Sequence, residues 1–330
     1  MSRLRLVFAG GDYDRTRALA DGTIRPEGID LVYLPLEPEE IFWRMLRYQD
    51  FDASELSMSA YIVLVSRGDC PFVAIPAFLS RTFRHGCIFV NAAAGIHDPR
   101  DLRGRRVGVP EYHMTAALWI RGLLEHEYGV RAADIEWFQG GVEEPGRQER
   151  IPLRLPPSIR VHPIGPDQTL DALLVAGEID ALIVARMPPS FVRGDPRVRR
   201  LFPDYKAVER EYFRKTGFFP IMHCVVIRRA LYEAHPWVAP TLLKALEASK
   251  RRALEQAYDS NALRYTLPWL LPDLEEAMRE LGRDPWPYGV AANRHTLEAM
   301  CQYAHEQGLT ERRVAVEELF APNTIETFRI

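Results

Sequence analysis

Short apolar runs alternate with segments of helical period along the N-terminal part of the chain. Leu4–Ala9, Leu31–Leu36 and Phe51–Leu56 are apolar runs of strand length, and Pro38–Leu46 begins with the proline that often opens a helix. Two glycines and several charged residues follow the first run and feed another helix. This alternation predicts a mostly parallel sheet with helices on both faces and ligands at the carboxyl ends of its strands.

The same alternation continues along the rest of the chain. Further apolar runs predict strands at Phe72–Phe78, Cys87–Asn91, Ile135–Phe138, Ile159–Ile164, Asp180–Val184 and Met222–Ile227. Periodic segments predict helices at Ala60–Val65, Thr169–Ala176, Asp204–Thr216, Trp237–Tyr258, Leu274–Leu281 and Thr296–Gln307. The segment Gly140–Pro157 is dense in Pro, Gly, Glu and Arg and predicts an irregular, exposed loop.

The stretch Asp98–Ala117 combines a loop, a strand and the start of a helix. Val107–Val109 is a short apolar run closed by proline, and the helical period that follows ends at Gly129, where a left-handed cap is expected. The turn Glu111–Thr115 should therefore lie between the carboxyl end of a strand and the amino end of a helix, where free backbone N–H groups favour anions. The stretch predicts a binding site, with an ordinary connection as the alternative.

Composition limits the class of protein. The chain has 330 residues, of which 47% are hydrophobic and 26% charged, with 42 basic and 45 acidic residues. A chain of this length normally divides into two domains and folds without disulfides or metals. The net charge of −3 gives no basis for general nucleic-acid binding. No window reaches the roughly 18 apolar residues of a membrane span, so we expect no membrane partner.

The cysteines and the N-terminus indicate a cytoplasmic protein. The apolar run Leu6–Ala9 is too short for the apolar core of a secretion signal. The four cysteines form no C-x-x-C pair, which predicts reduced and mostly buried thiols at Cys70, Cys87, Cys224 and Cys301.

Common catalytic motifs are missing, which argues against hydrolases, kinases and dinucleotide-binding enzymes: the sequence has no G-x-S-x-G, G-x-x-x-x-G-K-[ST], H-E-x-x-H or G-x-G-x-x-G. Basic and polar side chains at expected strand ends suit a small anionic ligand and a proton transfer. They are Asp12, Asp14, Arg15, Ser57, Arg81, His85, Glu111, Tyr112, His113, Thr115, Arg186 and His223. For Ser57, capping of the following helix is the first interpretation, and a single histidine is more often structural than functional.

The connector Leu79–Gly86 carries more donors than a surface turn needs. It holds two arginines, two hydroxyls and His85 between two expected strands, and a guanidinium matches a carboxylate in shape and charge. A solvated loop is the alternative interpretation.

Nearly the whole chain resembles the 4,5-dihydroxyphthalate decarboxylase family. The motifs that carry the resemblance are G-D-Y-D-R-T from Gly11, S-M-S-A-Y from Ser57, R-T-F-R-H from Arg81, D-L-R-G-R-R-V-G-V-P-E-Y from Asp101, G-E-I-D-A-L-I from Gly177 and F-P-I-M-H from Phe219. The resemblance implies an α/β protein with the two-lobed fold of type II periplasmic binding proteins. One lobe would comprise residues 1–91 and 222–330, and the other residues 92–221, with the ligand cleft between them.

The resemblance implies a carboxy-lyase of phthalate degradation that converts 4,5-dihydroxyphthalate to protocatechuate and CO2. Its partner would be a small aromatic dicarboxylate, no redox cofactor would be needed, and a homo-oligomer is possible. We expect His223 to manage the proton that replaces the carboxylate, with His85 as its rival, and Arg81 and Arg186 to hold carboxylates from opposite walls. No histidine pair has a local metal-ligand spacing, so no metal is expected, although His85 and His223 could converge.

Two other functions stay open from the sequence. One is a non-catalytic binding protein of the importer type for a small aromatic or anionic ligand, which would normally carry a secretion signal. The other is a related lyase that acts on a different aromatic acid.

Overall fold

The N-terminal alternation of strands and helices builds a five-stranded sheet in the order β2-β1-β3-β11-β4. In the computed structural model, which describes residues 3–326, the strands are β1 (Leu4–Gly10), β2 (Ile29–Pro35), β3 (Ala53–Ser57), β4 (Phe72–Arg81) and β11 (Ile221–Arg228). The helices α1 (Asp14–Ala20), α2 (Pro38–Tyr48) and α3 (Met58–Arg67) connect the first four strands. β1 pairs in parallel with β2 and β3, as the sequence predicts.

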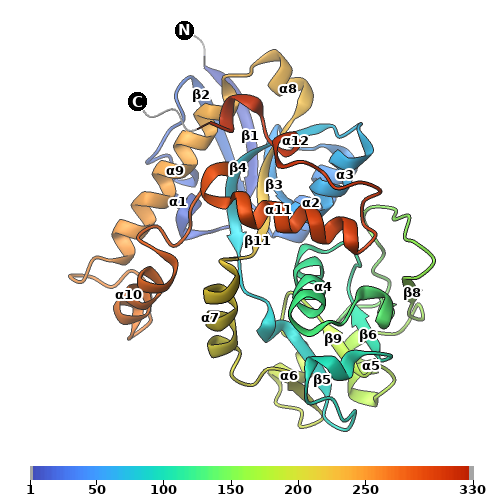
Figure 1. The fold of residues 1–330 in the computed structure, drawn as a ribbon. Coiled ribbons are helices and arrows are strands. Elements are labelled where there is room, and N and C mark those ends of the chain that lie inside the picture. The colour runs from blue at the N-terminus through green and yellow to red at the C-terminus, as the bar shows by residue number, and fades with distance from the viewer. Residues whose placement is uncertain (1–2, 327–330) are drawn as a thin grey trace.

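A second sheet of six strands has the order β10-β5-β9-β6-β7-β8. Its strands are β5 (Ile88–Asn91), β6 (Arg106–Val109), β7 (Glu136–Gln139), β8 (Arg160–Pro163), β9 (Ala181–Ile183) and β10 (Val198–Arg200). The accompanying helices are α4 (Thr115–Tyr128), α5 (Leu170–Ala176), α6 (Pro189–Val192) and α7 (Tyr205–Thr216). Figure 1 shows this sheet below the first one, so the molecule consists of two α/β units, each built on its own sheet.

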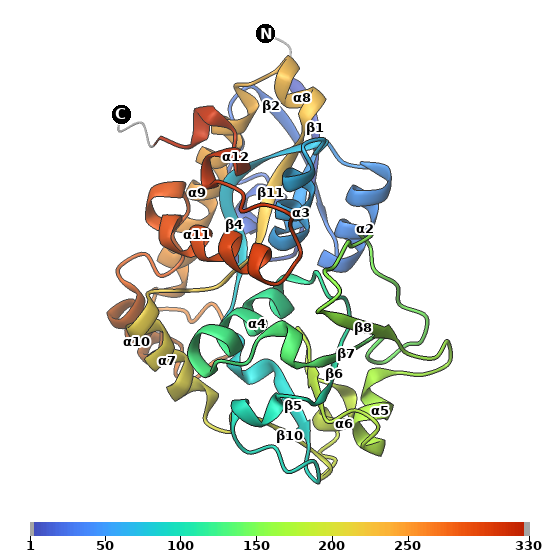
Figure 2. The ribbon, with the colours of Figure 1, turned by 45° about the vertical axis from the view of Figure 1, so that its right-hand side comes forward.

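The C-terminal helices pack on the first sheet, and they also contact a helix that accompanies the second sheet. They are α8 (Arg229–Ala234), α9 (Val238–Ala257), α10 (Leu270–Leu281), α11 (Val290–Glu306) and α12 (Val316–Leu319). α9 packs on α1 and β4, while α11 contacts both α3 and α4 and lies at the junction of the two sheets (Figure 2). A Cβ on Gly122 of α4 would overlap the ring of Tyr303 on α11, so this contact is close. No helix in residues 3–326 is long and apolar enough to cross a membrane.

Local signals in the sequence act as expected at the helix ends. The Ser57 hydroxyl accepts the Ala60 N–H and caps α3, and Gly129 ends α4 in the left-handed conformation with a φ of 69°. Left-handed backbone suits glycine because it has no Cβ to clash with the preceding carbonyl.

Three features differ from the sequence-based expectation. β11 runs antiparallel to both β3 and β4, because the chain re-enters the first sheet from the side of the second, so an antiparallel strand interrupts this otherwise parallel sheet between β3 and β4. β4 continues to Arg81 through its pairing with Ile221, which removes Arg81 from the expected connector. Ile88–Asn91 pairs with β9 and β10, which places these residues in the second sheet although the first lobe was expected to extend to residue 91.

We propose that the chain crosses between two lobes after β4 and again before β11. The composition of the two sheets supports this division, since β1–β4 and β11 form one sheet and β5–β10 the other. β1 and β3 end, and β11 begins, on the side of the first sheet that faces the second sheet. His223 lies opposite Ser57 in the register of β11 and β3, which brings these two side chains to that edge.

Candidate active site

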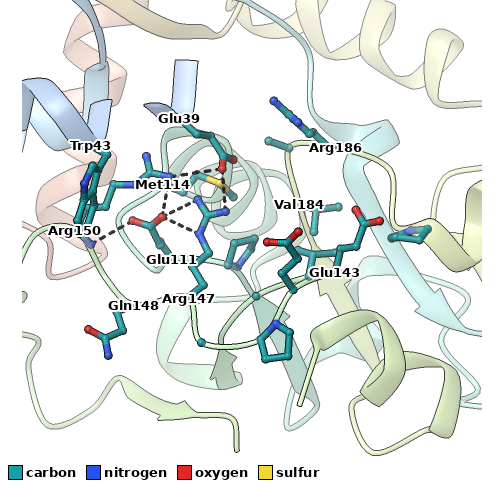
Figure 3. A pocket seen from close by; sticks show the side chains of 18 of the residues that line it. Glu39, Trp43, Glu111, Met114, Glu143, Arg147, Gln148, Arg150, Val184 and Arg186 are labelled. Atoms are coloured by element: carbon teal, nitrogen blue, oxygen red, sulfur yellow. Dashed lines mark hydrogen bonds and ion pairs between the residues drawn. The ribbon is translucent and has the colours of Figure 1, made fainter. Parts of the chain in front are cut away.

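A cavity of about 220 Å³, called the inner cavity below, lies between the two sheets. Side chains from both lobes line it: Tyr13, Pro38, Glu39, Phe42, Ser57, Ser80, Arg84, Glu111, His113, Met114, Thr115, Ala116, Arg147, Arg150, Ala185, Arg186, Met222 and His223. A larger cavity of about 700 Å³, the outer cavity, shares seven of these residues and is drawn in Figure 3. The shared residues therefore lie where the two cavities adjoin.

His223 is held by a buried carboxylate at the edge of the first sheet. Its Nδ1 lies 2.6 Å from Oε1 of Glu55, and the side chain of Glu55 is fully buried. The Tyr13 hydroxyl donates to the same oxygen over 2.8 Å, and the Gly11 N–H donates to Oε2 over 3.0 Å. Phe42 packs its ring edge-to-face against the imidazole, with centroids 4.8 Å apart. These contacts fix the ring, and no hydrogen bond within residues 3–326 engages Nε2, so this nitrogen can act on a ligand.

The carboxylate of Glu55 is stabilised in its charged form. Burial opposes that charge more than any single contact does, but His223, Gly11 and Tyr13 together hold the pKa of Glu55 below its usual range. The charge of Glu55 makes its hydrogen bond with His223 Nδ1 a charge-assisted one, which holds the ring in a single orientation.

The floor of the inner cavity joins the lobes through hydroxyl groups. Ser57 Oγ at the end of β3 lies 2.8 Å from Thr115 Oγ1, and Thr115 is the first residue of α4. Thr115 Oγ1 also accepts the Ser59 N–H over 3.2 Å. Met114, Thr115 and Ala116 line the cavity, so the turn predicted as a binding site does face it.

An ion-pair cluster, drawn in Figure 3, consists of residues that line both the inner and the outer cavity. Glu111 is buried and pairs with Arg147 over 2.6 Å and with Arg150 over 3.1 Å. Glu39 on α2 reaches the same guanidinium groups from the other lobe, 3.2 Å from Arg147 and 3.8 Å from Arg150. The segment predicted as an exposed loop thus contributes two arginines to the cavity, because the buried carboxylate of Glu111 pairs with both of them.

His113 is enclosed by carboxylates. Its Nδ1 contacts Glu149, and its Nε2 lies 3.6 Å from Glu111 Oε2. Burial opposes the charge of Glu149, but the hydrogen bonds from His113 outweigh it and lower the pKa of that carboxyl group. Both imidazole nitrogens of His113 therefore face protein carboxylates, which leaves this histidine poorly placed to exchange a proton with a ligand.

Arg84, in the connector after β4, faces the inner cavity with unsatisfied donors. Its Nε and Nη1 contact the sulfur atoms of Met222 and Cys87 over 3.2 and 3.6 Å, and Nη1 also donates to the Ala185 carbonyl over 3.2 Å. Sulfur is a weak acceptor. Within residues 3–326, no hydrogen bond engages Nη2. A buried guanidinium with spare donors suits a carboxylate ligand.

Arg81 makes structural contacts instead. Its guanidinium donates to the Pro287 carbonyl, to Asn293 Oδ1 and to the Phe219 carbonyl over 3.1, 2.8 and 2.8 Å. It stacks on the Phe219 ring, and it borders a neighbouring cavity rather than the inner one. Burial lowers the pKa of Arg81 to about 9. The residue ties the end of β4 to the C-terminal helices.

The remaining predicted residues divide between the cavity and the surface. Arg186 lines both cavities but is exposed and pairs with the exposed Glu37 over 2.9 Å. Asp12 and Asp14 form surface pairs with Arg17 and Arg15, and neither lines the inner cavity. Two residues are turned toward the protein interior: Arg15 lies over the Tyr13 and Trp286 rings, and the Tyr112 hydroxyl donates to the Gln307 carbonyl.

His85 lies in an aromatic environment outside the inner cavity. It packs edge-to-face against Phe202 and Tyr212, and its Nδ1 has no hydrogen-bond partner in the described part of the chain. Burial lowers the pKa of His85 to about 4, so the ring stays neutral near pH 7. Neither its position nor its charge state suits proton delivery. In residues 3–326, no group of three or more His, Cys, Asp or Glu side chains is placed to hold a metal ion.

The buried state of His85 predicts acid-sensitive stability. The unfolded chain takes up a proton near pH 6.5 and the folded chain only near pH 4, so the unfolded state binds more protons in this window and stability falls as the pH falls. The full shift corresponds to about 3 kcal/mol. Urea unfolding measures the effect. Between pH 7 and pH 4 the free energy of unfolding should fall less in His85→Phe than in the parent, by a large part of this amount. The exposed His97 serves as control through His97→Gln, and equal pH slopes in all three proteins would contradict the prediction.

Sequence reasoning missed several residues of the site. Glu55 was visible at the end of a strand, but its bond to His223 joins positions 168 residues apart. Arg147, Glu149 and Arg150 lie in a segment without periodicity, and the only available signal was alternating charge just before the apolar Ile151.

Relatives with known names match most of the chain. It is 44% identical over 330 residues, 100% of both chains, to a 4,5-dihydroxyphthalate decarboxylase of Comamonas testosteroni. It is also 41% identical over 218 residues, 66% of this chain and 84% of the relative, to a 4,5-dihydroxyphthalate decarboxylase of Pseudomonas putida. No family model matches the chain.

Two solved structures with a similar fold are sulfonate-binding proteins. The periplasmic aliphatic sulphonate binding protein SsuA of Escherichia coli aligns with a TM-score of 0.54 and 14% identity over 98% of this chain and 99% of its own. A sulfonate-binding SsuA of Methylobacillus flagellatus aligns with a TM-score of 0.56 and 14% identity over 98% and 94%. At this identity the similarity shows the fold alone, and it confirms the predicted binding-protein-like fold.

Proposed function

Because the chain belongs to the 4,5-dihydroxyphthalate decarboxylase family, it is a carboxy-lyase, and we propose that the inner cavity is where it removes one carboxylate from 4,5-dihydroxyphthalate. The observation that supports this reaction is the 44% identity that extends over the whole of both chains. The two products would be protocatechuate and CO2.

The charges of the inner cavity support a dianionic substrate. Four arginines line it, Arg84, Arg147, Arg150 and Arg186, against the carboxylates Glu39 and Glu111. The excess of two positive charges balances the two negative charges of an aromatic dicarboxylate. Phe42 and Met222 add apolar surface for the ring, as expected of a small-molecule site with few convergent polar groups.

The proposed reaction starts with proton transfer from His223 Nε2 to the ring carbon that bears the carboxylate. The hydroxyl oxygen para to that carbon shares the resulting positive charge. The bond to the carboxylate carbon then breaks, its electron pair restores the aromatic ring, and CO2 leaves. His223 regains a proton from solvent. Proton addition and CO2 loss balance without any electron transfer, so the step requires no oxidant or reductant.

We propose that Arg84 binds one substrate carboxylate. Arg84→Lys should raise KM roughly tenfold or more, because a lysine ammonium cannot reproduce the planar guanidinium in a charge-assisted pair worth about 1.5–3 kcal/mol. Steady-state kinetics and thermal unfolding of this variant measure the effect. Arg81→Lys is the matched comparison and should show its main effect on the unfolding temperature, since Arg81 bonds to protein carbonyls. An unchanged KM in Arg84→Lys would remove Arg84 from the site.

The function itself is tested by incubating the protein with 4,5-dihydroxyphthalate and following CO2 release and protocatechuate formation. Phthalate is the matched control, because it lacks the para hydroxyl that shares the charge and should bind without reacting. Tight binding of 4,5-dihydroxyphthalate with no CO2 release would instead favour a non-catalytic binding protein.

We also propose that the protein works in the cytoplasm. All four cysteines are unpaired in the structure, and three of them are buried, which suits a reducing compartment.

A further inference from the structure

Glu39 stands at the border between the two cavities. It belongs to the first turn of α2 in the first lobe, yet its carboxylate reaches two arginines of the loop in the second lobe (Figure 3). One oxygen, Oε2, makes both contacts, 3.2 Å from Arg147 Nη1 and 3.8 Å from Arg150 Nη2. Glu39 is thus the carboxylate that meets these arginines from across the cleft.

The two carboxylates on this arginine pair are held very differently. Glu111 has 2% of its side chain exposed, accepts hydrogen bonds from Nε and Nη2 of Arg147 and from the Arg150 backbone N–H, and forms an ion pair with Arg150 Nη2. Glu39 has 48% of its side chain exposed, and its carboxylate contacts only these two arginines within residues 3–326. Glu111 is a fixed partner of the guanidinium groups, whereas Glu39 can be exchanged for another carboxylate at little cost.

We propose that Glu39 is an affinity-determining residue that occupies, in the empty protein, the place of one substrate carboxylate on Arg147 and Arg150. This inference rests on the proposed function, because it takes the ligand to be an aromatic dicarboxylate. Binding then exchanges one carboxylate for another: the substrate pairs with the two arginines, and Glu39 turns to solvent in the outer cavity. Each binding event must break the Glu39 contacts, so Glu39 weakens binding of the substrate.

The inference predicts that removal of the charge tightens binding. Glu39→Gln should lower the Kd for phthalate, used as an unreactive dicarboxylate probe, by roughly fivefold, the change that corresponds to the roughly 1 kcal/mol of an exposed ion pair. The KM for 4,5-dihydroxyphthalate should fall in parallel with kcat nearly unchanged. High salt should shrink the difference between variant and parent, since exposed charges are screened.

Glu37→Gln is the matched control. Glu37 lies two residues away on the same helix start and pairs with the exposed Arg186, so its loss should change phthalate affinity much less. Calorimetric titration of both variants and the parent gives the three Kd values. Unchanged or weaker binding in Glu39→Gln overturns the inference. Weaker binding would instead indicate that the Glu39 ion pairs hold the two lobes together around the ligand. Absence of CO2 release by the parent protein would refute the proposed function, but the phthalate titration would still decide the role of Glu39.

Discussion

Replacement of His223 by glutamine is expected to lower kcat by roughly a hundredfold or more, with KM within a few-fold of the parent value. A positioned general acid contributes roughly 10²- to 10⁴-fold to a proton transfer, and the amide of glutamine cannot donate and recover a proton near neutral pH. Substrate binding should survive, because guanidinium groups rather than the imidazole meet the carboxylates. Steady-state kinetics with CO2 detection measure the change, and a loss of kcat without loss of affinity marks an interaction made in the transition state.

Folding and the identity of the acid need separate checks for this variant. His223 is 17% exposed in its side chain and lies at the start of β11, so the unfolding temperature of His223→Gln should stay near that of the parent. His113→Gln is the matched comparison, since His113 also lines the inner cavity but has both nitrogens facing carboxylates. A well-folded His223→Gln protein that turns over at nearly the parent rate would refute the proposed role of His223 as the proton donor.

The sequence predicted His223 for reasons that the structure makes concrete. A strand after a complete α/β unit indicated that the chain returns to the first sheet, and an imidazole at the start of such a strand should face the cleft. β11 does pair with β3, and His223 lies opposite Ser57. The antiparallel direction of β11 was not predicted, because an apolar run of strand length carries no information on the direction of its partners.

The connector between β4 and β5 shows where sequence reasoning ends. It predicted carboxylate-binding arginines in the motif that starts at Arg81, but periodicity could not tell which arginine faces the ligand. Pairing between β4 and β11 extends the strand through Arg81 and directs that side chain to backbone carbonyls. Arg84 then faces the cavity, and His85 turns into an aromatic cluster. The pairing that extends β4 through Arg81 therefore sets the directions of these three side chains.

The loop Gly140–Pro157 illustrates a second limit. Its composition correctly predicted irregular backbone, but composition does not reveal that Arg147 and Arg150 turn inward to Glu111. Glu111 was predicted as a ligand-binding residue from its place before a helix. In the structure it orients two arginines, so the turn and the loop form one site that neither segment specifies alone.

Loss of the charge on Glu55 is the second large effect that we expect. Glu55→Gln should lower kcat roughly tenfold to a hundredfold, within the roughly 10²- to 10⁴-fold that a general acid supplies. A neutral amide beside Nδ1 holds the imidazole less firmly than the carboxylate does, because a charge-assisted hydrogen bond is lost. The buried donors of Tyr13, Gly11 and His223 would also compete for one amide oxygen, and an unpaired buried donor costs about 1–3 kcal/mol.

Stability against pH separates this role of Glu55 from simple packing. The folded pKa of Glu55 is depressed, so its ionisation stabilises the protein above the unfolded value of about 4.3, and this contribution is lost as the pH falls through the lower folded value. Glu55→Gln should therefore be less stable than the parent at pH 7, and the difference should narrow toward acid pH. Tyr13→Phe is the matched control: it removes one donor to Glu55 Oε1 but keeps the carboxylate, so its kcat should fall much less. The contrary outcome is that Glu55→Gln and Tyr13→Phe lower kcat equally and show the same dependence of stability on pH. In that case the charge of Glu55 does not assist His223, and the carboxylate has only a structural role.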